Sequence, residues 1–382
     1  MPVIAWMNPI RLGGDSPLSE IALTTLVGSA GFAVGAVFGW AARASDFCTM
    51  GALSDMVFLG DRRRLRAWVL AMAVALLGSQ ALQAGGWINL DKSIYLGASL
   101  PWAGAILGGL MFGYGMTLAG GCGSKTLVRL GGGNLKSLVV VLVTGLFATM
   151  TLKGLLAMER IALEQATNIA ATRLGASGQS LPALLAGWGL PEAVGRPLAV
   201  AVLAGGALIW CLKDAAFRTA GSTLAGALVI GLTVPAGWAV TGILGADDFD
   251  PVQLTSLSFI SPMGDGLMYL MTYTGATISF GVAAVGGIVA GSFLAARLGG
   301  SFALEGFADT ADLLRHLGGA ALMGIGGIMA MGCTIGQGLT GLSTLSATSF
   351  LALASIILGG VIGLRSLDEG GLRGGLRSFL SR

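Results

Sequence analysis

The chain has 382 residues, of which 54% are hydrophobic and only 11% are charged, and its mean hydropathy is +0.82. Soluble domains contain roughly 25% charged residues, so this composition excludes a soluble globular protein and indicates an integral membrane protein. The formal net charge of +3 is small, which argues against a nucleic acid as a partner. The first 20 residues include Asp15 and Glu20 and lack the basic-then-apolar pattern of a cleavable signal sequence, so none is predicted.

Apolar runs recur along the whole chain, and a run of about 18 or more residues crosses the roughly 30 Å hydrocarbon core of a bilayer as a helix. We therefore predict an all-α polytopic membrane protein with about nine spans in one integral membrane domain, residues 1–382. In chain order the predicted spans are residues 21–42, 66–86, 101–119, 137–157, 197–213, 219–244, 269–296, 314–331 and 349–365.

Basic residues in the short connections predict the orientation, because positively charged loops remain in the cytoplasm. The strongest signal is DRRRLR at 61–66, and other basic residues agree with it: Lys125, Arg129, Lys136, Lys213, Arg218, Arg365, Arg373, Arg377 and Arg382. This pattern places the N-terminus outside and the C-terminus in the cytoplasm. The acidic stretch GADDFD at 245–250 and the segment 158–196 are then predicted to lie outside.

An internal repeat becomes visible when two cysteines are aligned. GYGMTLAGGCGSKTLVRL around Cys122 matches GIGGIMAMGCTIGQGLTGL around Cys333, and FCTMG at 47–51 matches ISPMG at 260–264 more weakly, which pairs Cys48 with Ser261. Five predicted spans precede the second copy, so the two copies are inverted, as in many secondary transporters. The predicted boundaries are a first repeat at about 21–157, a linker and extra span at about 158–213, and a second repeat at about 219–365.

The repeated motifs interrupt apolar helices with glycine and small polar residues. Non-helical backbone inside a membrane is tolerated only where protein or a water-filled cavity covers it, so these breaks line something. Half-helices that start at these breaks have unpaired N–H groups and the positive end of the helix dipole pointing toward one place. This arrangement favours the binding of an anion there. The residues predicted to line this path beside the cysteines are Thr49, Gly121, Gly123, Ser124, Lys125, Ser261, Gly332, Thr334, Gly336 and Gln337.

The cysteines narrow the choice of anion. The sequence has no C-x-x-C pair, no Asp or Glu beside Cys122 or Cys333, and a single histidine, His316, so no metal and no other cofactor is predicted. A cysteine in apolar surroundings stays neutral, and a neutral thiol is a weak donor that suits a soft sulfur or selenium acceptor. We therefore expect an anion to pass between thiols spaced along a narrow path. Cys211, inside an ordinary span, is expected to be structural.

Some of these features also have simple structural explanations. Free cysteines are often small buried apolar residues. The glycine positions Gly31, Gly35, Gly39, Gly109 and Gly113 fit helix-packing faces. The Lys125 ammonium is expected either to attract the anion or to snorkel to the headgroups.

The motifs FCTMG, GGCG and MGCTIGQGLTGLSTLS together resemble the YeeE/YedE family of sulfur-transport membrane proteins, over essentially the whole chain. The resemblance implies inverted repeats, a bacterial inner-membrane location, and uptake of thiosulfate along Cys48, Cys122 and Cys333. Members of this family often work with a small cytoplasmic sulfur-carrier protein of the TusA type. No such domain is fused to this sequence, so the resemblance implies either a separate carrier protein as a partner or no carrier at all. The segment 158–196 has no counterpart in the family pattern.

Other functions stay open at this point. A transporter of a selenium compound or of another small sulfur-containing anion would share nearly every feature described. A membrane sulfurtransferase or redox protein would need an exposed, activated thiol, and the lack of a basic neighbour for Cys333 argues against it. A purely structural membrane subunit would have little reason to keep irregular backbone at the membrane centre.

Overall fold

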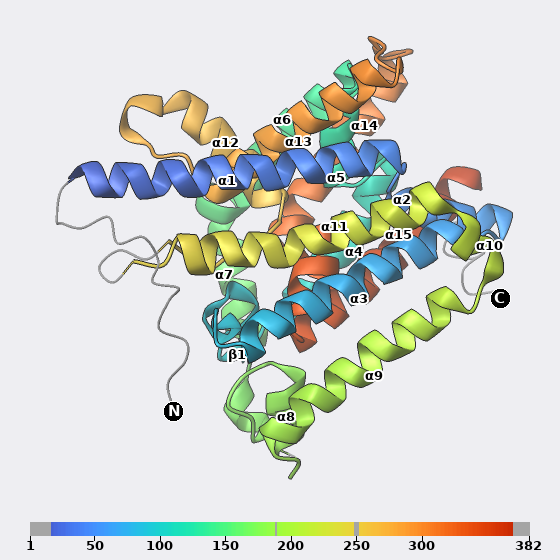
Figure 1. The fold of residues 1–382 in the computed structure, drawn as a ribbon. Helices are drawn as coiled ribbons and strands as arrows, with labels where there is room; N and C mark the ends of the chain where they lie inside the picture. The colour runs from blue at the N-terminus through green and yellow to red at the C-terminus, as the bar shows by residue number, and fades with distance from the viewer. Residues whose placement is uncertain (1–16, 188, 248–251, 370–382) are drawn as a thin grey trace.

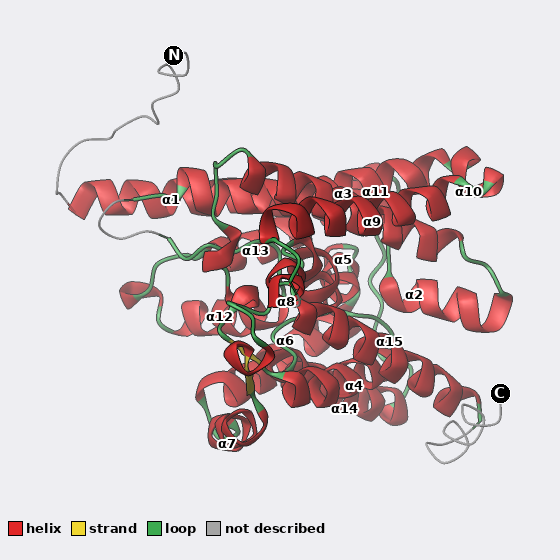
Figure 2. Cartoon of the chain, turned by 90° about the horizontal axis from the view of Figure 1, so that it is seen from below, coloured by secondary structure: helices red, strands yellow, loops and turns green. Residues whose placement is uncertain are grey.

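The computed structural model describes residues 17–187, 189–247 and 252–369 (Figure 1). Within these residues almost all regular structure is helical, and the strands form one short two-stranded ribbon (Figure 2). In the described part of the chain, eight helices are long and apolar enough to cross a membrane. The chain is therefore an all-α polytopic membrane protein, as its composition predicted. Several residues used for the orientation lie outside the described residues, namely 248–250, Arg373, Arg377 and Arg382, as does Asp15, which was used in the prediction about a signal sequence.

The elements follow one another with short connections. The α-helices are α1 (Pro17–Ala44), α2 (Thr49–Ser54), α3 (Arg63–Ala84), α4 (Trp102–Leu118), α5 (Gly123–Gly131), α6 (Leu135–Lys153), α7 (Ala157–Thr167), α8 (Leu181–Gly187), α9 (Glu192–Leu212), α10 (Ala215–Thr219), α11 (Gly221–Ala239), α12 (Ile260–Met271), α13 (Phe280–Leu298), α14 (Thr310–Met329) and α15 (Ala347–Asp368). Three π-helical segments are η1 (Asp55–Leu59), η5 (Val240–Leu244) and η7 (Gly336–Gly341). The strands are β1 (Ser99–Leu100) and β2 (Ile169–Ala170), and 3₁₀ turns occur at Leu90–Lys92, Ile94–Leu96, Ala171–Leu174 and Tyr273–Gly275.

Two predicted spans differ from the structure. The predicted span 314–331 is the 20-residue helix α14, which is not among the eight apolar helices because its first turns contain charged and polar residues. The predicted span 269–296 is wrong at its start, since α12 ends at Met271 and α13 begins at Phe280. The hydroxyl of Ser279 caps α13 by accepting a hydrogen bond from Val282 N at 3.3 Å, which fixes the later beginning.

The long helices pack in a pattern that repeats within the bundle. α1 packs along α13 and α11 along α3, while α15 packs on α4, α14 packs on α6, and α4 contacts α14 (Figure 1). Helices α1, α3, α4 and α6 correspond in this order to α11, α13, α14 and α15. When each helix is replaced by its counterpart, the same set of contacts is obtained. Two structurally repeated halves would have this property, although the predicted repeat boundaries themselves stay a prediction.

Glycines bring the backbones of these helices into direct contact. An added Cβ at Gly35 would lie 2.2 Å from the carbonyl oxygen of Ala284, and one at Gly113 would lie 2.1 Å from that of Ile356. Small residues at helix interfaces permit this close approach in membranes. The predicted packing role of these glycines is therefore confirmed.

The segment 158–196, which the family pattern did not explain, is a folded cap. It contains α7, β2 and α8, and β2 pairs antiparallel with β1. The cap docks on the connection before α15, where Leu181 N donates to Leu345 O at 2.8 Å and Ala347 N donates to Gln179 O at 3.0 Å. In Figure 1 the labels α7, β1 and α8 lie in the left half of the bundle, whereas α2 and α10 lie toward its right-hand end.

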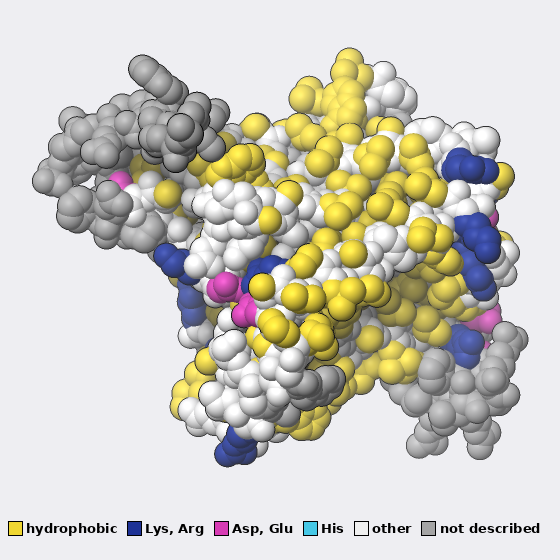
Figure 3. Space-filling view, turned by 60° about the horizontal axis from the view of Figure 1, so that its bottom comes forward, with side chains coloured by type: hydrophobic (Ala, Val, Ile, Leu, Met, Phe, Trp, Pro, Cys, Tyr) yellow, Lys and Arg dark blue, Asp and Glu magenta, His cyan; other side chains and the backbone are white. Residues whose placement is uncertain are grey.

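The outer surface of the bundle suits a bilayer. Hydrophobic side chains cover the middle of the face in Figure 3, and Lys, Arg, Asp and Glu side chains lie toward its two ends. Large apolar side chains that remain exposed to the outside include Leu146 on α6, Val202 on α9 and Leu232 on α11. Lipid tails solvate such side chains, so their exposure agrees with membrane-spanning helices.

Candidate functional site

The first break in the bundle follows α1. Phe47 N donates to Ala42 O at 3.1 Å, and Asp46 adopts a left-handed conformation with φ +50°, which ends the helix. Cys48 then starts α2 as its N-cap residue, and its sulfur accepts a hydrogen bond from Gly51 N at 3.3 Å. The Cys48 side chain is buried. The predicted break at Cys48 is therefore present.

The second break separates α4 from α5. Gly120 lies at φ +70°, a conformation that glycine adopts without penalty, and Gly121 N donates to Met116 O at 2.8 Å. Cys122 is the N-cap residue of α5 and is completely buried. Its sulfur lies 3.3 Å from the hydroxyl oxygen of Ser124, so these two groups share a hydrogen bond.

The third break follows α14. Gly332 N donates to Gly327 O at 2.7 Å, and the helix resumes after Cys333 before widening into the π-helix η7. The completely buried sulfur of Cys333 accepts a hydrogen bond from Gly336 N at 3.4 Å. π-helical segments are rare and occur frequently at functional sites.

The sulfur atoms of Cys48 and Cys333 have the same role in the backbone. Each accepts a hydrogen bond from the N–H group three residues later, as a serine does at an N-cap. The sequence had predicted that these N–H groups face the anion directly, but the sulfur atoms already satisfy two of them. Because each sulfur is an acceptor in this bond, its S–H proton remains available as a donor.

The three breaks meet inside the bundle. The thiols of Cys48 and Cys122 are neighbours that interact electrostatically, and the Cys122 thiol also lies beside the hydroxyl of Thr334. Cys333 is close enough to Cys122 to interact with it electrostatically. The thiols therefore form a series in the order Cys48, Cys122 and Cys333, with Thr334 at the step between the last two.

The side chain of Thr334 is completely buried, and its hydroxyl has no hydrogen-bond partner among the described residues. A buried hydroxyl without a partner costs about 1–3 kcal/mol. The Thr334 hydroxyl lies beside the thiols as a free donor, so it is suited to contact a ligand that is present only transiently.

The other predicted site residues take different places. Thr49 is buried at the start of α2. A Cβ added at Gly121 would lie 3.3 Å from Lys125 Cγ, and one at Gly123 would lie 3.1 Å from Ile260 Cδ1. A Cβ added at Gly336 would lie 2.7 Å from Ser258 Oγ. These glycines therefore bring the backbone close to the neighbouring segments.

Two predicted polar site residues, Gln337 and Ser261, make hydrogen bonds within the chain. The amide nitrogen of Gln337 donates to Ala330 O at 2.5 Å, and its buried Oε1 atom has no hydrogen-bond partner among the described residues. The hydroxyl of Ser261 donates to a carboxylate oxygen of Asp265 at 3.2 Å. Ser261 lies on the wall of a cavity that also includes Gly332.

That cavity is a vestibule of about 730 Å³ beside the breaks. Gly332, the residue before Cys333, is part of its wall, together with Ser258 and Ser261. Four polar or charged residues of the cap also contribute to the wall: Arg160, Glu164, Asn168 and Gln179. The vestibule therefore approaches the Cys333 end of the thiol series and is partly roofed by the cap.

Ionic side chains lie at the Cys48 end of the series. The Lys125 ammonium, whose side chain is only 12% exposed, forms an ion pair with Asp46, and Arg64 forms a second ion pair with the same carboxylate. The Lys125 ammonium is therefore paired with a carboxylate, a third arrangement beside the two expected ones, snorkelling to the headgroups and attracting an anion. Asp46 was not among the predicted site residues, although an acidic residue two positions before Cys48 is visible in the sequence.

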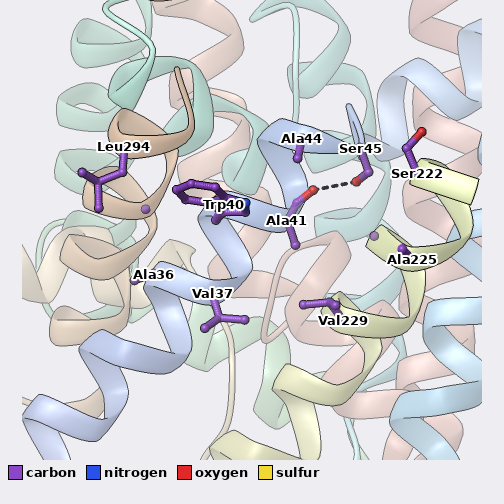
Figure 4. A pocket seen from close by; sticks show the side chains of 12 residues that line it. Ala36, Val37, Trp40, Ala41, Ala44, Ser45, Ser222, Ala225, Val229 and Leu294 are labelled. Atoms are coloured by element: carbon purple, nitrogen blue, oxygen red, sulfur yellow. Dashed lines mark hydrogen bonds between the residues drawn. The ribbon is translucent and has the colours of Figure 1, made fainter. Parts of the chain in front are cut away.

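A second cavity lies on the lipid-facing side of α1, α11 and α13. It has a volume of about 490 Å³ and is lined mainly by apolar residues such as Val37, Trp40, Val229 and Leu294 (Figure 4). The hydroxyl of Ser45 in its wall donates to Ala41 O of the same helix at 2.7 Å (Figure 4). This lining suits lipid tails and not an anion.

Cys211 lies apart from the thiol series, since its thiol donates to Arg66 O at 3.3 Å and joins α9 to α3. In the described part of the chain no three His, Cys, Asp or Glu side chains are grouped closely enough to bind a metal ion.

These features define a helical membrane protein with a thiol-lined interior and a vestibule on one side. The chain matches the protein family described as Sulphur transport over residues 44–362 and belongs to it.

Among its relatives is the thiosulfate transporter TsuA of Escherichia coli strain K12, which is 28% identical over 343 residues, 86% of this chain and 91% of the relative. The thiosulfate transporter TsuA of Spirochaeta thermophila is 26% identical over 347 residues, 86% of this chain and 96% of the relative. The probable transporter YedE of Escherichia coli matches a shorter part, with 32% identity over 102 residues, 26% of this chain and 22% of the relative.

Proposed function

We propose that this protein takes up thiosulfate across the bacterial inner membrane by passing the anion along Cys333, Cys122 and Cys48. The observation that supports this proposal best is the series of three buried thiols at the meeting point of three helix breaks. The thiosulfate transporters among the relatives align with most of the chain, which supports the same substrate.

The physical demand on such a path favours several weak contacts. An unpaired ion in a low-dielectric interior costs tens of kcal/mol by the Born estimate, so donors are needed along the whole route. Conduction also requires sites that are weak enough to release the ion. Three thiols and the unpaired hydroxyl of Thr334 meet both requirements, because each replaces a small part of the lost hydration.

The proposed direction is from the vestibule to the cytoplasm. Basic residues cluster at one set of helix ends, namely the Arg62–Arg66 cluster, Lys213 and Arg218. This face of the bundle is therefore proposed to be cytoplasmic. The vestibule, α7 and α8 then face outward, the N-terminus lies outside, and the C-terminus lies in the cytoplasm. A small sulfur carrier of the TusA type is the proposed partner that receives the sulfur there.

The proposed architecture consists of two inverted repeats, with boundaries near 21–157 and 219–365 and the extra span between them. The contact pattern of the long helices, which maps onto itself when the halves are exchanged, supports this proposal. Inverted repeats place equivalent breaks at a common depth from opposite sides.

Transport is proposed in preference to sulfur-transfer catalysis because a catalytic thiol needs an activating base. The chain's single histidine, His316, has its Nδ1 atom 2.7 Å from Asp312 O in the first turns of α14. Cys333 follows the far end of that helix, so His316 is not placed to activate its thiol.

The experiment that tests the proposal is uptake of radiolabelled thiosulfate by cells that lack their own sulfur importers. Cells that express the protein are expected to accumulate the label faster than cells with an empty vector, and excess selenite is expected to leave the rate unchanged. Strong competition by selenite would favour the alternative, a transporter of a selenium compound. No uptake by the intact protein, with or without a co-expressed TusA-type carrier, would contradict the proposal.

A separate prediction concerns the unpaired hydroxyl. Thr334→Val keeps the shape of the side chain and removes the hydroxyl, so we expect a several-fold lower uptake rate and unchanged or slightly higher thermal stability. The matched control is Thr340→Val, because the Thr340 hydroxyl donates to Leu257 O at 2.6 Å and its loss is expected to cost about 1 kcal/mol of stability. Normal uptake by a stable Thr334→Val protein would remove Thr334 from the path.

A further inference from the structure

The inner end of the thiol series holds a carboxylate between two cations. Lys125 Nζ contacts one oxygen of Asp46, and Arg64 Nη2 contacts the other oxygen. Arg64 also lies 3.4 Å from Asp55, measured from Nη1 to Oδ2. The Asp46 carboxylate therefore contacts both cations through its two oxygens, as a bound oxyanion would.

This ionic cluster is adjacent to the thiols. Lys125 follows Cys122 by three residues in the first turn of α5 and acts electrostatically on the Cys48 thiol. Arg64 lies over the turn that Cys48 begins, since a Cβ added at Gly51 would lie 2.9 Å from Arg64 Nη1 and 3.5 Å from Cys48 Cβ. An anion that leaves the thiols at this end meets both cations.

The three charged groups differ in their freedom to move. The side chain of Lys125 is 12% exposed and that of Arg64 is 37% exposed, whereas the Asp46 side chain is 55% exposed. Asp46 can therefore turn into water at low cost, while Lys125 is held beside the thiols. When Asp46 turns away, the two cations present free donors toward Cys48 and Cys122.

We propose that Lys125 and Arg64 form an anion-binding subsite at the inner mouth, and that Asp46 is its built-in competing anion. This inference rests on the proposed thiosulfate transport. The arriving thiosulfate displaces the Asp46 carboxylate from the two cations, and the returning carboxylate displaces thiosulfate into the cytoplasm. Without Asp46 the subsite would bind the anion too tightly, and rapid conduction needs weak sites.

The test uses purified full-length protein in liposomes and initial rates of radiolabelled thiosulfate uptake. Asp46→Asn is the chosen variant because asparagine tolerates the left-handed backbone at this position. We expect the half-saturating concentration and the maximal rate both to fall about fivefold, the effect of roughly one exposed ion pair. Titration of the detergent-solubilised protein with thiosulfate is expected to show correspondingly tighter binding.

Lys125→Met is expected to have the opposite effect on affinity and to raise the half-saturating concentration. In the double variant Asp46→Asn/Lys125→Met the affinity gained from Asp46→Asn is expected to disappear. Lys125→Met also keeps the inference testable if Asp46→Asn does not fold.

The matched control is Asp61→Asn, which removes another aspartate that is paired with an arginine. Hydrogen bonds from Arg63 lower the pKa of Asp61, and the pair lies 2.7 Å apart between α2 and α3 without contacting the cysteines. We expect wild-type kinetics for this control. Active wild-type protein with unchanged or weakened affinity in Asp46→Asn would overturn the inference and leave thiosulfate transport standing. A wild-type protein that neither transports nor binds thiosulfate would overturn both.

Discussion

Cys333→Ser is expected to reduce thiosulfate uptake at least about tenfold, which corresponds to about 1.4 kcal/mol in the transport barrier. Serine keeps the N-cap hydrogen bond from Gly336 N, so the backbone of the break should remain intact. It replaces a soft donor at the vestibule end of the series with a hard hydroxyl. The measurement is the initial rate of radiolabelled uptake at equal amounts of protein in the membrane.

Cys211→Ser is the control for this prediction. The Cys211 thiol donates to Arg66 O at 3.3 Å, and a serine hydroxyl can make the same bond, so uptake should stay close to wild type. Cys48→Ser and Cys122→Ser are expected to behave like Cys333→Ser. If all four serine variants transport equally well, the thiols are buried structural residues and the path lies elsewhere.

Gly113→Ala is expected to destabilise the folded protein by about 3 kcal/mol, near the upper end of the usual overpacking cost. The added Cβ would lie 2.1 Å from Ile356 O and 2.7 Å from Gly360 N, both backbone atoms of α15. Neither atom can move without separating α4 from α15. The measurement is the apparent melting temperature of the purified protein in detergent, together with its yield as a single species in size-exclusion chromatography.

Gly206→Ala is the matched control, because no atom lies within 4 Å of a Cβ added there and the residue is also in the middle of a long helix. Both substitutions improve intrinsic helix propensity by roughly 1 kcal/mol, so any difference between them reports the contact with α15. Equal melting temperatures would mean that the two helices are not closely packed at Gly113.

Hydropathy and glycine positions were sufficient to predict most of the spans and the breaks at the three cysteines. An apolar run long enough to cross the bilayer has few alternatives to a helix, and the motifs around Cys48, Cys122 and Cys333 interrupt such runs. The predicted start of α13 was wrong because residues 272–279 carry no charge that would end a span, while a single hydroxyl at Ser279 decides where the helix begins.

The chemistry of the site was less predictable, since it depends on contacts between distant parts of the chain. The proximity of the Cys48 and Cys122 thiols, and the ion pair of Asp46 with Lys125, exist only after α1, α2 and α5 are packed together. The use of cysteine sulfur as an N-cap acceptor is a local feature, but it depends on a side-chain rotamer that the residue types do not determine. The cap of residues 158–196 likewise acquires its place through backbone bonds to the start of α15.

The close contact between α4 and α15 has a consequence for biogenesis. α15 is the last helix of the described chain, and its glycine-mediated partner α4 enters the membrane much earlier during synthesis. Until α15 is inserted, the small-residue face of α4 and the docking site of the cap remain uncovered. The nascent protein is thus an open intermediate for most of its translation, and in such intermediates uncovered faces promote misassembly. A truncation that removes α15 should accordingly be recognised by membrane quality-control proteases as an unassembled protein.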